Sequence, residues 1–217
     1  MMRQTSSSYT MPKPATVIVG IGGCGSNMVN SFVASKQIDC HTIGVDTDSV
    51  ALKSSKADER LLLDNRASSN CGLRGDIELG IQTGIHFREK FLQRIAGYGT
   101  ITFCAGLGGG TGSGITAVFT KAAIDMERDV LCFLTMPFTF EGEERHTKAQ
   151  AVLKEIGSYG AWLEIFDNQK LFDELPKGAT FGDAYKIVNK HFLSLLQDEA
   201  ANGFDRQSYN PSRCKVS

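Results

Sequence analysis

The sequence GLGGGTGSG at residues 106–114 holds six glycines in nine positions, and the interpretation of the chain starts from it. An apolar run over residues 100–105 predicts a strand before it, and residues 115–126 follow with the spacing of a helix. Each glycine in ordered structure costs about 0.5–1 kcal/mol relative to alanine. Backbone N–H groups at the positive end of a helix suit a polyphosphate, and Thr111 and Ser113 add hydroxyl donors. The segment therefore predicts a phosphate-binding loop; a glycine-rich turn required only for packing is the alternative.

The loop at residues 106–114 lacks the lysine of the common phosphate-binding loop. In the G-x-x-x-x-G-K-[ST] pattern a lysine follows the glycines, and no lysine follows them here. The charge of the phosphates is therefore expected to be met by backbone dipoles, by Mg²⁺ and by an arginine.

A second glycine turn, GIGGCGSN at residues 20–27, lies between a predicted strand at 15–19 and a predicted helix at 27–34. It contains G-x-G-x-x-G, and Asp46 ends the next predicted strand, at 42–45. This arrangement is typical of a dinucleotide site, but glycines also serve tight strand–helix packing. A dinucleotide-dependent enzyme does not ordinarily need a second phosphate loop, so we keep an oxidoreductase only as a minor alternative.

Strand and helix patterns alternate along the rest of the chain. Alternation of this kind predicts an α/β fold with a three-layer, Rossmann-like parallel sheet and helices on both faces. Such a sheet binds its ligand at the carboxyl ends of the strands. We expect one domain over residues 15–201, a flexible N-terminal tail over 1–14 and a polar C-terminal tail over 202–217. The further predicted elements are a loop at 64–75, helices at 77–95, 143–156 and 181–201, and strands at 130–136 and 162–166.

The composition narrows the classes of function. The net charge of −1 gives no basic excess for a nucleic-acid partner. The most apolar stretch, residues 130–140, is too short to cross a bilayer, and the N-terminus has no apolar signal core. We therefore expect no membrane insertion and a cytoplasmic location. The six cysteines form no Cys-x-x-Cys pair and the four histidines are scattered, which favours reduced thiols over a zinc site.

The motifs, taken in order, resemble the FtsZ/tubulin family, closer to its FtsZ branch, from about residue 15 to 200. The signature G-G-G-T-G-[ST]-G is complete at residues 108–114, and the first loop G-x-G-G-x-G-x-N is complete at 20–27. The companion segments are Asp46-Thr47-Asp48, the run at 51–57, P-F-x-F-E-G at 137–142 with Arg145 beyond it, N-x-K-L at 168–171 and D-A-[FY] at 183–185.

The resemblance implies a site for GTP or GDP with Mg²⁺. In it, Asn168 and Asn189 read the guanine edge, since an amide both donates and accepts, and Tyr185 stacks on the base. Glu141 binds the ribose and Arg145 lies near the ribose or the phosphates. From the spacing of the residues alone, Tyr185 belongs to the apolar stripe of a core helix, and Glu141 belongs to the acidic first turn of a helix. The residues assigned to nucleotide binding are Gly22, Gly23, Cys24, Asn27, Asp46, Asp48, Gly75, Gly108, Gly109, Gly110, Thr111, Gly112, Ser113, Glu141, Arg145, Asn168, Tyr185 and Asn189.

Two segments depart from the family pattern. Residues 72–76, GLRGD, replace the usual G-A-G-A-N-P segment, so Arg74 either supplies charge in place of backbone donors or is a solvated surface arginine. The chain also ends soon after the long helix, where family members continue into an acidic loop and a second domain. Asp205 is the one candidate catalytic carboxylate there.

The sequence thus predicts a guanine-nucleotide-binding, FtsZ-like protein, a weak or partner-dependent GTPase linked to cell-division-type filaments. Hydrolysis needs a positioned water and a carboxylate, so we expect firm binding and slow turnover. The expected partners are full-length FtsZ-like or other filament subunits. The alternatives are a non-hydrolysing GTP-binding regulator or cap of such filaments and, remotely, an NAD(P)-dependent enzyme.

Overall fold

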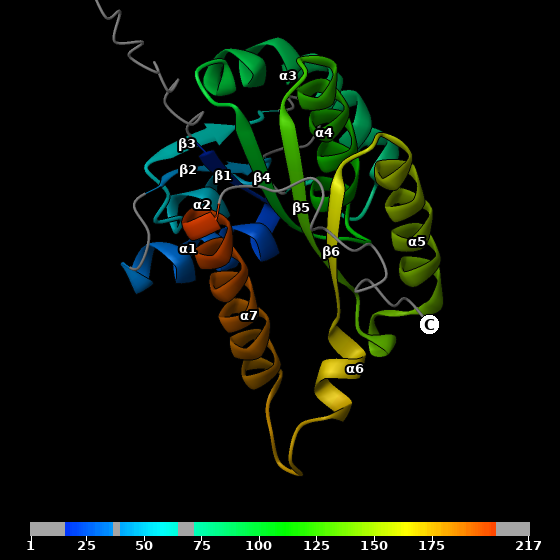
Figure 1. The fold of residues 1–217 in the computed structure, drawn as a ribbon. Helices are drawn as coiled ribbons and strands as arrows, with labels where there is room; N and C mark the ends of the chain where they lie inside the picture. The colour runs from blue at the N-terminus through cyan, green and yellow to red at the C-terminus, as the bar shows by residue number, and fades with distance from the viewer. Residues whose placement is uncertain (1–15, 37–39, 65–71, 203–217) are drawn as a thin grey trace, which may run out of the picture.

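A computed structural model describes residues 16–36, 40–64 and 72–202, and the two predicted tails lie mostly outside these ranges (Figure 1). Its centre is a six-stranded sheet in the order β3-β2-β1-β4-β5-β6, and every neighbouring pair is parallel. The strands are β1 (Thr16–Ile21), β2 (His41–Asp46), β3 (Glu59–Leu62), β4 (Thr100–Gly106), β5 (Asp129–Met136) and β6 (Trp162–Asp167).

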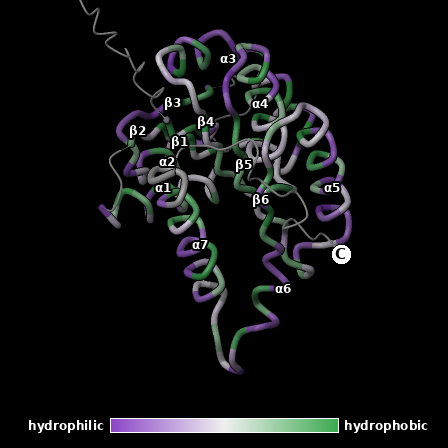
Figure 2. The backbone as a smooth tube through the Cα atoms, in the orientation of Figure 1, coloured by the Kyte–Doolittle hydropathy of each residue, from purple (hydrophilic) through white to green (hydrophobic). Residues whose placement is uncertain are grey.

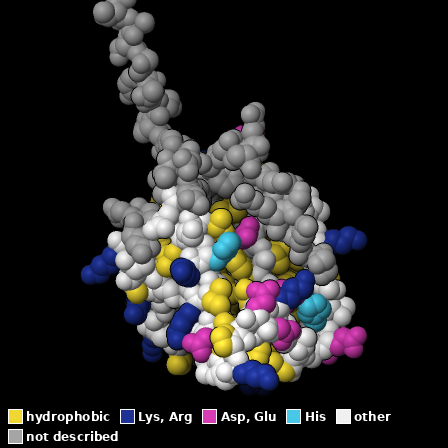
Figure 3. All heavy atoms as spheres, turned by 60° about the horizontal axis from the view of Figure 1, so that its bottom comes forward, with side chains coloured by type: hydrophobic (Ala, Val, Ile, Leu, Met, Phe, Trp, Pro, Cys, Tyr) yellow, Lys and Arg dark blue, Asp and Glu magenta, His cyan; other side chains and the backbone are white. Residues whose placement is uncertain are grey.

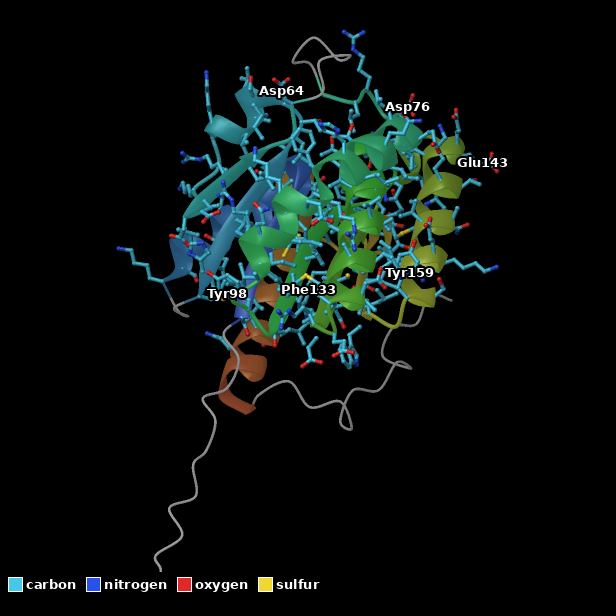
Figure 4. All side chains as sticks on the ribbon, turned by 90° about the horizontal axis from the view of Figure 1, so that it is seen from above. Asp64, Asp76, Tyr98, Phe133, Glu143 and Tyr159 are labelled. Carbon is cyan, nitrogen blue, oxygen red and sulfur yellow. The ribbon has the colours of Figure 1, made fainter. Side chains whose placement is uncertain are left out.

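Helices cover both faces of this sheet, so the predicted three-layer α/β architecture is confirmed. They are α1 (Gly22–Ser35), α2 (Ser49–Lys53), α3 (Ile77–Ile95), α4 (Thr116–Asp125), α5 (Glu143–Ser158), α6 (Asn168–Asp173) and α7 (Phe181–Asn202). Helices α3, α4 and α5 pack on one face, and α1 and α7 pack on the other (Figure 1). Asp76 and Glu143 mark the starts of α3 and α5 in Figure 4, and Tyr98 and Tyr159 lie just beyond their ends.

Two hydrophobic cores follow from the alternation of side chains along the buried strands. Under α3 and α4, the ring of Phe91 stacks on that of Phe119 with centroids 4.0 Å apart. Under α1 and α7, the ring of Phe192 meets that of Phe133 edge-on at 4.7 Å. Figure 2 shows the result as hydrophobic central strands and more hydrophilic outward turns of the helices. Burial on both faces explains why the central strands read as nearly continuous apolar runs.

The first glycine turn is more helical than the sequence predicts. Helix α1 begins at Gly22, whereas the apolar spacing predicted a start at residue 27. The glycines therefore form the first turn of the helix itself, directly after β1. The sequence also did not predict β3, α2 or α6, which have only four to six residues each and so carry little periodicity.

The sheet order reverses between β1 and β4, and this places the two glycine segments together. These strands pair directly, with Gly20 opposite Cys104 and Ile21 opposite Ala105. The segments that follow them, at residues 22–27 and 106–114, therefore leave the sheet side by side. In sheets of this topology the crevice at such a switch point is where a ligand binds. Among the residues that the structure describes, no helix is long and apolar enough to cross a membrane.

Candidate functional site

A cavity of about 340 Å³ opens at the carboxyl ends of the strands. Figure 3 turns this end of the molecule forward and shows acidic, basic and hydrophobic side chains on the same face. The cavity brings together the predicted residues Gly22, Gly23, Cys24, Asp46, Gly75, Gly109, Gly110, Thr111, Gly112, Glu141, Arg145, Asn168 and Tyr185. Its other lining residues include Arg74 and Thr135, and Thr135 is one that the sequence analysis missed because it carries no motif and only ends a strand.

The loop at residues 106–114 continues from β4 into a short π-helix, Gly110–Ile115, and then into α4. Gly112 lies so close to the preceding chain that a Cβ there would be 2.1 Å from the carbonyl oxygen of Gly106. Gly109 is open by comparison, since a Cβ would approach only the Arg145 guanidinium, at 3.5 Å. Gly112 thus serves packing, whereas Gly109 leaves its backbone accessible in the cavity, and the role of the loop in phosphate binding stays a prediction.

Arg145 lies against this loop and brings a positive charge next to Gly108 and Gly109. Gly108 has a φ of +93°, and a Cβ on it would lie 2.6 Å from the Cγ of Arg145. The Arg145 Nη1 pairs with Glu141 Oε2 at 3.0 Å, and the other oxygen of Glu141 accepts from the backbone N–H of Phe138 at 2.8 Å. Glu141 is therefore already held by its own loop and by Arg145.

Ser113 and Asp48 hold the surrounding backbone and do not line the cavity. The Ser113 hydroxyl is fully buried and accepts from the backbone N–H of Gly108 at 2.8 Å. The Asp48 carboxylate caps α2 by accepting from the N–H groups of Val50 and Ala51, at 2.7 and 3.2 Å. Their roles toward a ligand stay predictions, and the structure gives each of them a local structural role.

Asp46 is a buried carboxylate at the end of β2, facing the cavity. It is 4% exposed and accepts from the backbone N–H groups of Thr47 and Asp48, at 2.7 and 3.1 Å. Burial raises the pKa of Asp46 despite these hydrogen bonds. The neighbouring Thr47 hydroxyl lies 2.9 Å from that of Thr111, which ties the end of β2 to the glycine loop.

A second cavity of about 380 Å³ adjoins the first and shares Cys24 and Tyr185 with it. Asn27 and Asn189 line this second cavity, so two predicted residues absent from the first meet here. The Asn189 amide donates to the hydroxyl of Ser31 at 2.8 Å. Tyr185 is 39% exposed, so it stands at the mouth of the two cavities and not in the core of α7.

Asn168 has a buried amide oxygen with no hydrogen-bond partner among the described residues. The residue begins α6, is 4% exposed and lines the first cavity. A buried carbonyl oxygen left unpaired costs free energy, so such an atom beside a cavity points to a ligand that donates to it. The site therefore combines accessible backbone N–H groups, two arginines and an amide acceptor without a partner in the described part of the chain, which suits a phosphorylated ligand with a hydrogen-bonding base.

A sequence model of the Tubulin/FtsZ family, GTPase domain, matches residues 15–176. The chain belongs to the Tubulin/FtsZ family. It is 33% identical over 177 residues, 82% of this chain and 32% of the relative, to the cell division protein FtsZ of Magnetospirillum gryphiswaldense.

Solved structures of this family share the fold. An empty FtsZ dimer from M. jannaschii superimposes with a TM-score of 0.78 at 24% identity, over 86% of this chain and 54% of that one. A GTPγS-bound protofilament of CetZ2 from Haloferax volcanii gives 0.77 at 23% identity, over 89% and 61%. The chain thus spans about a third of the FtsZ sequence and somewhat more than half of the structures that it matches.

The remaining family expectations concern a metal ion and a catalytic carboxylate. No group of three or more His, Cys, Asp or Glu side chains that could hold a metal occurs in the part of the chain that the structure describes. A Mg²⁺ ion is commonly held by substrate phosphates, waters and one or two carboxylates, so the cavity fits an ion that arrives with the nucleotide. Asp205, the predicted catalytic residue, lies outside the described residues.

Proposed function

We propose that this chain binds GTP and GDP across the two adjoining cavities. The observation that carries the proposal is the buried amide oxygen of Asn168, which has no partner in the described ranges and lines the same cavity as the glycine loop. Guanine offers N–H donors on its Watson–Crick edge, and an amide oxygen accepts from them. Asn27 and Asn189 in the adjoining cavity add further amide groups, and Tyr185 offers a ring at its mouth.

The phosphates would lie on the loop at residues 108–114. Accessible backbone N–H groups at the start of a helix bind anions, and the Arg145 guanidinium adds a full charge beside Gly108 and Gly109. Glu141, held by Arg145, would receive the ribose hydroxyls. Mg²⁺ would neutralise part of the phosphate charge, with Asp46 as the buried carboxylate at the cavity.

Hydrolysis is proposed to be weak or dependent on a partner. Attack on the terminal phosphate needs a water that a polar group orients, and phosphoryl transfer otherwise rests on positioning and charge stabilisation. Asp205 stays the one predicted carboxylate for that role in this chain. In the GTPγS-bound CetZ2 protofilament, subunits of the same fold assemble with nucleotide. We propose by analogy that this chain acts with full-length FtsZ-like subunits in cell-division-type filaments.

The nucleotide is identified by denaturing the purified protein and separating what it releases by chromatography, followed by calorimetry with GTP, ATP and NAD. We expect guanine nucleotide in the preparation and a preference for GTP over ATP. Binding of NAD without binding of GTP would contradict the proposal.

Hydrolysis is tested by phosphate release from GTP, with the chain alone and mixed with full-length FtsZ. We expect slow release alone and faster release in the mixture than from the two components summed. Tight GTP binding with no added release in the mixture would instead favour the non-hydrolysing regulator or cap of filaments.

A further inference from the structure

The turn from Leu73 to Asp76 holds an arginine in a backbone conformation that favours glycine. Arg74 has a φ of +46° and Gly75 a φ of +84°, and the N–H of Asp76 donates to the carbonyl of Leu73 at 2.9 Å. A β-turn with positive φ at both central positions is ordinarily built from Gly, Asn or Asp. This backbone conformation costs free energy for a non-glycine residue, and residues held in such strained conformations cluster at binding sites and active sites.

The two other described non-glycine residues with positive φ have a different explanation. Lys36 caps the end of α1, and Glu127 follows directly after the end of α4. Helices commonly end in a left-handed residue, so both positions follow from helix termination. Arg74 ends no helix, so its conformation needs another reason.

The turn is fixed against the glycine loop. A Cβ on Gly110 would lie 2.8 Å from the Cβ of Leu73 and 2.5 Å from the carbonyl oxygen of Asp76. Leu73 is only 4% exposed and anchors the turn in the core beneath α3. Arg74 consequently lines the same cavity as Gly109, Gly110 and Arg145. It reaches this cavity from the turn and not from a helix or a strand.

The guanidinium of Arg74 has no hydrogen-bond or ion-pair partner within residues 16–36, 40–64 and 72–202. Every other arginine in the described ranges donates to a carbonyl or pairs with a carboxylate, whereas Arg74 has no acceptor among the described residues. The partners are Ser55 for Arg60, Glu89 for Arg88, Glu59 for Arg94, Ala96 for Arg128 and Glu141 for Arg145. An exposed, unpaired guanidinium at a cavity lined by backbone N–H groups adds to a site for anionic oxygen.

We propose that Arg74 binds the terminal phosphate of the nucleoside triphosphate and so makes this chain prefer the triphosphate to the diphosphate. The proposal rests on the proposed function of the cavity. Arg145 covers the loop at Gly108 and Gly109, and Arg74 adds a second charge to the same cavity from the turn that packs against Gly110. A planar guanidinium binds two phosphate oxygens at once, which a backbone donor at the same position cannot do.

The decisive variant is Arg74→Gly, because glycine adopts the positive φ without strain and removes only the side chain. Lys36→Gly is its matched control, since it also removes one positive charge and one left-handed side chain, at the far end of α1. Calorimetry with GTPγS and with GDP gives the two dissociation constants for each protein, and thermal unfolding gives Tm.

We expect Arg74→Gly to weaken GTPγS binding about 10-fold or more and GDP binding less than 3-fold, with Tm unchanged or higher. Lys36→Gly should change neither constant, and Arg74→Lys should restore part of the preference. Equal loss for both nucleotides, or no loss, would overturn the role of Arg74 and leave the proposed function intact. A wild-type protein that binds neither nucleotide would overturn the proposed function and, with it, this assignment.

Discussion

The two cavities of the candidate site are built in different ways. The cavity beside the loop at residues 108–114 is formed largely by backbone that continues directly from the paired strands β1 and β4. The cavity of Asn27 and Asn189 is formed by side chains from α1 and α7, which meet only because α7 packs across the sheet. The loop is packed against backbone at Gly110 and Gly112 and is rigid there, whereas a cavity between helices depends on how they dock.

Because of this difference, substitutions in the two cavities should have different effects on folding and on recognition. In the first cavity a methyl group added at Gly110 or Gly112 would collide with backbone, so damage at these two positions should spread into the fold. In the second, Asn189 is partly exposed and its amide already bonds to Ser31, so its removal should change recognition and leave the fold intact.

Replacing Gly112 by alanine should have the largest effect. A Cβ at that position would lie 2.1 Å from the Gly106 carbonyl oxygen, so the added atom would collide with backbone in a packed loop. We expect a loss of about 2–3 kcal/mol of unfolding free energy, as for overpacked cores, together with loss of nucleotide binding. Urea unfolding measures the first and calorimetry the second. Gly97→Ala is the control, since its Cβ would meet nothing within 4 Å, and equal stability of the two variants would contradict the rigid-loop interpretation.

Replacing Arg145 by alanine should weaken binding without unfolding the protein. The Arg145 side chain is 47% exposed, lies over Gly108 and pairs with Glu141. Losing a charge-assisted contact to phosphate costs about 1.5–3 kcal/mol, which is about a 10- to 100-fold loss of GTP affinity. Calorimetry measures it, with Lys154→Ala on the same helix as the control. Unchanged affinity would mean that the backbone alone holds the phosphates.

Replacing Asn189 by alanine should act on base selectivity alone. The amide lines the second cavity and is held by Ser31, so its loss removes hydrogen bonds to the base and little packing. We expect the preference for GTP over ATP to fall about 10-fold, the equivalent of one hydrogen bond, with Tm unchanged. Competition binding of the two nucleotides measures the ratio, and Gln150→Ala on α5 is the control. An intact preference would remove Asn189 from base recognition.

Replacing Asp46 by asparagine should have the smallest effect, a pH-dependent gain in stability of the nucleotide-free protein. Burial raises the pKa of Asp46, so the folded state keeps this proton to higher pH than the unfolded state does. The stability that the protonated group contributes is complete below the unfolded pKa and is lost as pH rises through the folded pKa. The variant should therefore melt about 2 °C higher than the wild type at pH 7 and equally at pH 3.

Thermal unfolding across this pH range measures the effect, with the exposed Asp64→Asn as the control. A lower Tm for Asp46→Asn at pH 7 would show that the ionised carboxylate stabilises the folded state through its two backbone hydrogen bonds.

The elements that could be predicted from sequence are those with long, buried apolar patterns. The seven-residue β4 and the eight-residue β5 are buried almost throughout and read as strands without ambiguity. The four-residue β3 is an edge strand with two apolar residues, and α2 is five residues long behind the Asp48 cap. Such short elements form because the neighbouring strand and the cap stabilise them. A local hydrophobic pattern does not show these contacts, so it does not predict the elements.

Within the site, the sequence identifies residues by their type and misses Thr135, which belongs to no motif and only ends a strand. For Arg74 the sequence leaves two alternatives, a charge donor and a surface residue, and the structure places it at the cavity. Conversely, Ser113 belongs to the signature but turns inward to the N–H of Gly108. Side-chain direction within a glycine loop depends on φ angles that glycine leaves unspecified, so only the folded loop decides it.

The sequence by itself determined that this protein is an α/β protein with two glycine segments at strand ends, because hydrophobic period and glycine spacing are local properties of the chain. Only the folded chain shows that the two segments emerge from adjacent strands. It also shows that the buried acceptor of Asn168 and the guanidinium of Arg74, both at the cavity, have no partner among the described residues. Strand order, burial and the choice of partners depend on contacts between residues far apart in the chain. These contacts turn a list of motif residues into a site.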